Sequence, residues 1–161
     1  MADFENYQML TNLILNFVPS LSAEDIIICS DHDYVARYII DINKEVSLVN
    51  IDHHHDVTYK LDDDQILNCS NWVKILKDKN LCLNYFWIHN INSIHPAPEQ
   101  FDKYIDAKST IKQLNIDTLM SPSKLFLCLS PQWVPPFYHK LFYLWLDLLN
   151  RQYNTHFDFS C

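Results

Sequence analysis

Short apolar segments alternate along the chain with longer segments of helical periodicity. The apolar segments cover residues 26–29 (IIIC), 46–51 (VSLVNI), 83–88 (LNYFWI) and 125–129 (LFLCL). Each has the length of a strand and is bounded by polar or turn-forming residues. Because their apolar residues are mostly continuous rather than alternating, they predict strands buried on both faces, as in a parallel sheet.

Helical patterns lie around and between these strands, over residues 5–17, 35–42, 71–80 and 137–152. In the second of them Val35, Tyr38, Ile39 and Ile42 follow the spacing of one helix face. Residues 96–118 fit neither pattern clearly. The order of elements predicts a single α/β domain over residues 1–161, a three-layer sandwich around a mostly parallel central sheet.

Composition supports one domain and narrows the classes of partner. The chain has 161 residues, 48% of them hydrophobic, and a formal net charge of −8. An acidic protein is not expected to offer a broad contact surface for nucleic acid phosphates. No apolar run is long enough to cross a bilayer, and the N-terminus lacks the pattern of a signal peptide. Five cysteines without a CxxC pair complete the prediction of a reduced, cytoplasmic protein with no membrane partner.

The chain contains no glycine. Every backbone position with positive φ must therefore be taken by another residue, most cheaply by asparagine or aspartate. The absence of glycine also excludes a glycine-rich phosphate loop and a dinucleotide fingerprint.

Polar clusters follow three of the predicted strands. They read SDHD at residues 30–33, DHHHD at 52–56 and SPQW at 130–133. In open α/β sheets, ligands gather beyond the carboxyl ends of the strands. These clusters are therefore the candidate functional residues.

The second cluster has the composition of a metal site. Asp52, His54 and Asp56 are alternate residues, so in an extended segment all three face one side, with the intervening histidines turned away. Mixed carboxylate and imidazole ligands suit Mn²⁺, Fe²⁺ or Zn²⁺, and His32 is a candidate fourth ligand. One or two such ions activate water for hydrolysis, which gives these residues a catalytic role as well. A solvated histidine-rich loop is the alternative interpretation.

The third cluster and one helix start supply candidate substrate-binding residues. Ser130 and Gln132 are alternate residues after the last strand, and Gln132 can accept or donate hydrogen bonds or act as a weak neutral ligand. The alternative is a strand that leads into a proline-bounded turn. Asn71 either lies near the same pocket or, as the more favoured alternative, caps a helix whose next residue, Trp72, belongs to the core.

The motifs resemble the arginase-like ureohydrolases, and most closely the small, divergent branch that includes the peptide arginases. The specific part is D-x-H-x-D, here Asp52, His54 and Asp56, and Asp31–His32 is similar to the upstream motif. The resemblance spans about residues 24–150. It implies a three-layer α/β fold and a binuclear Mn²⁺ site that hydrolyses a guanidinium to urea and an amine. It also implies that Asp52 bridges the ions, with His32 and Asp56 on one and His54 on the other.

The chain departs from that family at its closing motif. Ureohydrolases carry S-x-D-x-D with two further carboxylate ligands, where this chain has Ser-Pro-Gln-Trp-Val at residues 130–134. A mononuclear enzyme and a non-catalytic relative therefore both stay open.

Three functions compete on this evidence. The first is a hydrolase that converts arginine, free or within a peptide or protein, to ornithine and urea, since an acidic surface favours a cationic substrate. The second is a metal-dependent phosphoesterase, because IDHH at residues 51–54 resembles the namesake motif of the DHH family. The third is a binding protein that has lost catalysis, such as a phage or mobile-element inhibitor of a host factor.

Overall fold

A computed structural model describes residues 2–58, 66–90, 92–93, 99–113, 121–132 and 134–160. The helices are α1 (Ala2–Phe17), α2 (Asp33–Ile42), α3 (Trp72–Asp78) and α4 (Pro136–Tyr153). The strands are β1 (Ile26–Cys29), β2 (Val46–Ile51), β3 (Cys82–His89), β4 (Ala107–Thr110) and β5 (Leu125–Cys128). Short 3-10 helices cover Val18–Ser20, Ala23–Asp25, Glu99–Tyr104 and Ile111–Gln113. The predicted α/β class is confirmed: all paired strands are parallel, in two sheets compatible with an α/β sandwich.

The chain divides into two compact units. Unit 1 contains residues 1–34 and 116–161, and unit 2 contains residues 35–115. The division falls inside α2, whose first two residues belong to unit 1 and whose other residues belong to unit 2. The single domain predicted over residues 1–161 stays a prediction.

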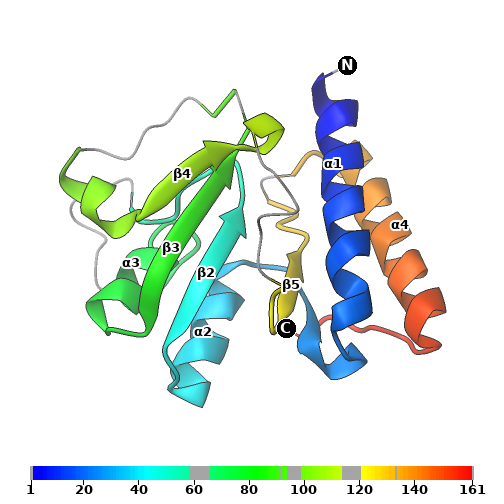
Figure 1. Ribbon diagram of the computed structural model, residues 1–161, viewed down its shortest axis with the longest axis horizontal. Coiled ribbons are helices and arrows are strands. Elements are labelled where there is room, and N and C mark those ends of the chain that lie inside the picture. Colours follow the sequence, from blue (N-terminus) through cyan, green and yellow to red (C-terminus); the bar gives the residue numbers. More distant parts are fainter. Residues whose placement is uncertain are drawn as a thin grey trace. The chain divides into compact units, whose positions relative to one another are not determined.

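Unit 1 is built on the parallel pair β1 and β5, in which each residue from Ile26 to Cys29 lies opposite one from Leu125 to Cys128. Helices α1 and α4 lie side by side in this unit (Figure 1). Their apolar side chains join those of the strands in a common core: Ile14, Val18, Leu21, Ile26, Ile28, Leu127, Leu129, Phe142, Leu146 and Leu149. Burial of these side chains stabilises the unit, since each buried aliphatic side chain contributes about 1.5–3 kcal/mol.

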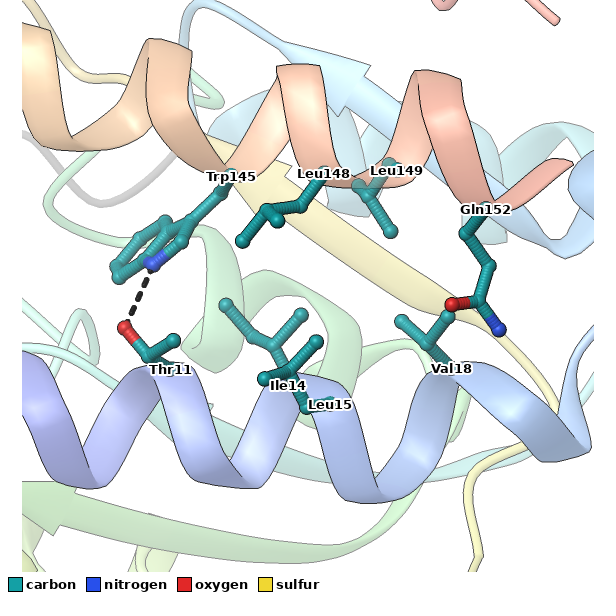
Figure 2. A pocket seen from close by; sticks show the side chains of 8 residues that line it. All are labelled: Thr11, Ile14, Leu15, Val18, Trp145, Leu148, Leu149 and Gln152. Atoms are coloured by element: carbon teal, nitrogen blue, oxygen red, sulfur yellow. Dashed lines mark hydrogen bonds between the residues drawn. The ribbon is translucent and has the colours of Figure 1, made fainter. Parts of the chain in front are cut away.

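The contact between α1 and α4 leaves a small pocket that is almost entirely apolar (Figure 2). It is lined by Thr11, Ile14, Leu15, Val18, Trp145, Leu148, Leu149 and Gln152. The indole N–H of Trp145 donates a hydrogen bond of 2.9 Å to the hydroxyl of Thr11, which satisfies the polar end of this ring.

Unit 2 is built on a parallel sheet in the order β2–β3–β4 (Figure 1). One face is buried, with Tyr85 and Trp87 at 0% and 4% exposure. On the other face Val49 and its partner Phe86 are 50% and 42% exposed. The prediction that β2 and β3 are buried on both faces is therefore wrong. Their apolar residues are continuous along the sequence although some of them, Val49 and Phe86, are exposed to solvent.

The predicted helices and four predicted strands are all present in the described residues, with ends shifted by a few residues at most. Strand β4 was not predicted, because its sequence AKST is short and lacks the apolar character of a buried strand. None of the described helices combines the length and the apolar character that crossing a membrane requires.

Asparagine takes several of the backbone positions that glycine usually occupies, as predicted. Asn43, Asn80 and Asn154 have φ of 48°, 57° and 49° and follow the ends of α2, α3 and α4. Asp56 and Ser130 also have positive φ, 53° and 48°, in the loops after β2 and β5. The backbone of both loops is therefore held in a conformation that costs about 1–2 kcal/mol for a residue other than glycine.

Candidate metal centre

Asp56 is the most strongly held acidic residue of the loop after β2. Its side chain is almost fully buried, at 1% exposure. One carboxylate oxygen, Oδ2, accepts a hydrogen bond of 2.8 Å from the indole N–H of Trp72 and one of 3.3 Å from the amide of Asn50. Its backbone carbonyl accepts from the N–H of Val73 at 3.1 Å. Burial of a carboxylate is unfavourable unless donors or cations compensate it, and these contacts compensate it and fix the position of Asp56.

Tyr85 joins this network from β3. Its hydroxyl accepts a hydrogen bond of 3.0 Å from Asn50 and donates one of 3.0 Å to the backbone carbonyl of His55. Burial, followed by the negative charge of Asp56, raises the pKa of Tyr85 well above its ordinary value. The hydroxyl therefore keeps its proton at neutral pH and continues to hold the loop against the sheet.

Asp52 lies at the beginning of the loop, directly after β2. Its backbone N–H donates to the carbonyl of Ile88 at 3.1 Å, and its own carbonyl accepts from the indole N–H of Trp87 at 3.0 Å. The side-chain oxygen Oδ1 accepts from the backbone N–H of His54 at 3.3 Å, which bends the chain away from the strand. Asp52 is half-buried, so its carboxylate is less shielded from solvent than that of Asp56.

Two of the predicted ligands lie close together in the loop after β2. One carboxylate oxygen of Asp52 and one of Asp56 lie within 4.8 Å of each other. Donors about 2.0–2.2 Å from one small cation are at most about 4.4 Å apart, so the two carboxylates have nearly the span of a single-ion site. His32 directly precedes the first residue of α2 and belongs to unit 1, so its role as a ligand stays a prediction.

The two carboxylates do not meet for the reason that the sequence suggested. Residues 52–54 bend rather than extend, and Asp56 adopts a positive φ. Strand alternation therefore cannot account for the proximity of Asp52 and Asp56, which results from a turn. His54 is half-buried, and its metal-binding and catalytic roles stay predictions.

The flanking histidines differ from each other. His53 is exposed, and one ring nitrogen lies 3.2 Å from the hydroxyl of Ser93. His55 is fully buried, with its ring against Trp87 and its Nδ1 accepting from the N–H of Val57 at 3.2 Å. His55 thus contributes to the packing of the loop.

The predicted substrate-binding residues have structural contacts of their own. Asn71 is buried at the start of α3, where its side chain accepts from the N–H of Asn68 and donates to the carbonyl of Ile66, both at 2.9 Å. It therefore holds the preceding loop and makes no side-chain cap to α3. Ser130 is buried and Gln132 is exposed in the turn after β5 in unit 1. Substrate binding by these three residues stays a prediction.

Sequence reasoning missed the residues that orient Asp56. Trp72 was interpreted as core, and it is buried at 2% exposure, but its N–H donates to the carboxylate. A buried indole N–H usually requires a hydrogen-bond acceptor, so a tryptophan expected in the core also predicted a polar partner near its ring. The second signal was Asn50 inside a strand, because asparagine is depleted in strands unless its amide has a specific partner.

Comparisons of the chain with protein-family models, with curated proteins and with solved structures found no match. The resemblance to arginase-like ureohydrolases therefore stays a prediction. The finding that stands on the geometry is the coarser one: two neighbouring carboxylates, Asp52 and Asp56, that could contribute to a metal site.

Proposed function

We propose that the protein is a metal-dependent hydrolase, with its metal site at the loop after β2. The observation that supports this proposal is the proximity of the Asp52 and Asp56 carboxylates within 4.8 Å, with Asp56 almost fully buried. A bound divalent ion supplies a Lewis acid that lowers the pKa of water toward neutrality.

Each residue has a distinct part in this proposal. Asp56 is a fixed ligand, because Trp72 and Asn50 hold its Oδ2. Asp52 is the more exposed carboxylate, which can bind the ion and can also accept a proton from water. His32 provides a neutral nitrogen donor, and His54 is the predicted fourth ligand.

The donor set favours Mn²⁺, with Fe²⁺ or Zn²⁺ as alternatives. The proposed donors, two carboxylates and the imidazole of His32, make a mixed oxygen and nitrogen set without a thiolate, which suits these ions better than Ca²⁺. These donors suffice for one ion, and a second ion requires His54.

The substrate class that we propose is a guanidino group, as in arginine or an arginyl peptide or protein. A guanidinium is planar and always charged, and it pairs well with carboxylates. The net charge of −8 favours a cationic substrate over a phosphorylated one. Hydrolysis would yield urea and an amine, which for arginine is ornithine.

The first experiment measures metal content by elemental analysis of protein purified without chelator, followed by titration of Mn²⁺ into stripped protein. Wild type is compared with Asp52→Asn and with Asp41→Asn, which changes an exposed aspartate of α2 to the same amide. We expect wild type and Asp41→Asn to bind Mn²⁺ and Asp52→Asn to bind it at least tenfold more weakly. We expect Asp52→Asn to keep the wild-type Tm or exceed it, because two nearby carboxylates repel each other when no ion is bound.

Activity is then assayed with Mn²⁺ on arginine, agmatine and arginyl peptides by release of urea, and on a short oligonucleotide by release of mononucleotide. Urea release that Asp52→Asn abolishes supports the proposal. Mononucleotide release instead would replace it with the phosphoesterase alternative. Absence of metal binding in the wild type would reject both, and would favour the non-catalytic binding protein.

A further inference from the structure

Two cysteines face each other across the parallel pair of strands in unit 1. Cys29 ends β1, Cys128 ends β5, and the two are register partners. Their sulfur atoms lie only 2.7 Å apart. The pairing continues beyond them, because the N–H of Leu129 donates to the carbonyl of Cys29 at 3.0 Å and the N–H of Ser130 donates to the carbonyl of Ser30 at 2.8 Å.

This backbone is compatible with a disulfide. Neighbouring strands lie about 4.7–4.9 Å apart, which is within the range of about 4.4–6.8 Å that disulfide-bonded Cα atoms span. Because hydrogen bonds on the carboxyl side hold the strands together, the two thiols stay opposed without any movement of another segment. Cys29 is fully buried, whereas Cys128 is half-buried and so is the more accessible of the two.

We propose that Cys29 and Cys128 form a redox-active thiol pair that is oxidised to an intramolecular disulfide by a low-molecular-weight disulfide, such as oxidised glutathione. In the first step the Cys128 thiolate attacks one sulfur of the small disulfide, which forms a mixed disulfide and releases one small thiol. In the second step the Cys29 thiolate attacks the sulfur of Cys128 and releases the other small thiol. The protein loses two electrons and two protons, and the small disulfide gains both.

The other described cysteines provide internal comparisons. Cys69 is half-buried, as Cys128 is, but it lies outside the paired strands. Cys82 is buried in β3, its thiol lies 3.4 Å from the carbonyl of Asn84, and burial raises its pKa to about 11. Neither is expected to form an internal disulfide, and Cys82 is expected to react slowly because thiolate is the nucleophile.

The disulfide would close a long loop, since its two cysteines are 99 positions apart in the chain. Closing such a loop restricts the unfolded chain and stabilises the folded one. Oxidised protein is therefore expected to unfold at a Tm higher by about 5 °C. This inference is independent of the proposed metal site, because it involves none of its ligands.

The experiment uses the full chain with Cys161→Ser, since Cys161 lies outside the described residues. Reduced protein is incubated with oxidised glutathione, alkylated and digested with trypsin without reductant. The sequence places Cys29, Cys69, Cys82 and Cys128 on four different tryptic peptides, so each possible disulfide gives a distinct cross-linked mass. We expect peptide 1–37 linked to peptide 125–140, with a loss of two hydrogen atoms per chain.

Two variants test the order of attack, and Cys69→Ser is the matched control. Cys29→Ser should accumulate a stable glutathione adduct on Cys128, whereas Cys128→Ser should react at least tenfold more slowly at Cys29. Cys69→Ser should form the disulfide at the wild-type rate. A wild type that carries only glutathione adducts, that links other cysteines, or that forms the expected link only after denaturation would overturn the proposal without reference to the variants.

Discussion

The loops after β2 and β5 both leave the carboxyl end of a parallel strand, but they are held in different ways. In the loop after β2, side chains from two strands and a helix reach in: Asn50 and Trp72 bind Asp56, and Tyr85 binds the backbone of His55. In the loop after β5, the hydrogen bonds of Ser130 that define the turn come from its backbone, to Ser30 and from Val134. Gln132 is exposed in that turn.

The difference shows that the end of a parallel strand supplies a position but does not by itself supply a site. Both loops contain a residue with positive φ, Asp56 at 53° and Ser130 at 48°. Only the first carries a buried carboxylate with side-chain donors around it. A metal ligand must be kept charged and oriented, which requires neighbours that offset burial.

The largest expected effect comes from removal of the Asp56 carboxylate. Asp56→Ala leaves the buried N–H of Trp72 without its acceptor and opens a cavity, whereas the relief of repulsion with Asp52 offsets part of the cost. We expect a loss of about 2 kcal/mol in the free energy of unfolding of metal-free protein. Ser130→Ala, which leaves the backbone hydrogen bonds in place, should lose about 0.5 kcal/mol or less.

Urea denaturation of both variants in the presence of chelator measures this difference. Asp56→Asn is the control for shape, because its amide oxygen can still accept from Trp72, and it should recover at least half of the loss. Equal destabilisation by Asp56→Ala and Ser130→Ala would show that the two loops do not differ as their contacts indicate.

The sequence predicted the fold better than it predicted the environment of the site. Strand and helix positions follow from apolar runs and periodicity, which are local, and β2 and α3 lie where they were expected. The strand AKST was missed, because its formation depends on pairing with β3 and not on its own residues. The exposed face that carries Val49 and Phe86 was also missed, since exposure depends on which layers cover a sheet.

At the candidate site, the residue types were sufficient to identify Asp52 and Asp56 as neighbouring carboxylates of a possible metal site. The reason given for their convergence was wrong, because a bend and a positive φ replace strand alternation. The partners of Asp56 could not be deduced from spacing, since Trp72 is 16 positions away from it in the chain. Such contacts depend on how the helix packs on the sheet.

The second prediction tests whether Trp72 acts through Asp56. Trp72→Phe keeps most of the buried ring but removes the N–H that donates to Oδ2. We expect the Kd for Mn²⁺ to rise about tenfold, as for other residues that orient a metal ligand, with a change in Tm of a few degrees. Isothermal titration of stripped protein gives the Kd.

The matched control is Trp145→Phe, which removes the equivalent indole hydrogen bond to Thr11 in the pocket between α1 and α4 (Figure 2). It should change stability to a similar degree and leave the Kd for Mn²⁺ unchanged. An equal loss of affinity in both variants would mean that Trp72 acts only through general stability.

The smallest effect is a pH dependence at the loop after β2. Burial and the charge of Asp56 raise the pKa of Tyr85 above its ordinary value, so the folded state retains this proton longer than the unfolded chain does. The stabilising contribution is therefore fully present below about pH 10, and it is lost progressively as the pH rises toward the folded pKa. At pH 10.5 the loss amounts to about 0.8 kcal/mol.

Tyr85→Phe has no such proton, so its deficit in unfolding free energy relative to wild type should shrink between pH 9 and 10.5 by that amount. Ile28→Val, which shortens a buried side chain of unit 1 and removes no titratable proton, should keep a constant difference from wild type over the same range. A constant deficit for Tyr85→Phe would mean that Tyr85 titrates no differently in the folded protein than in the unfolded chain, and that the network around Asp56 does not protect its proton.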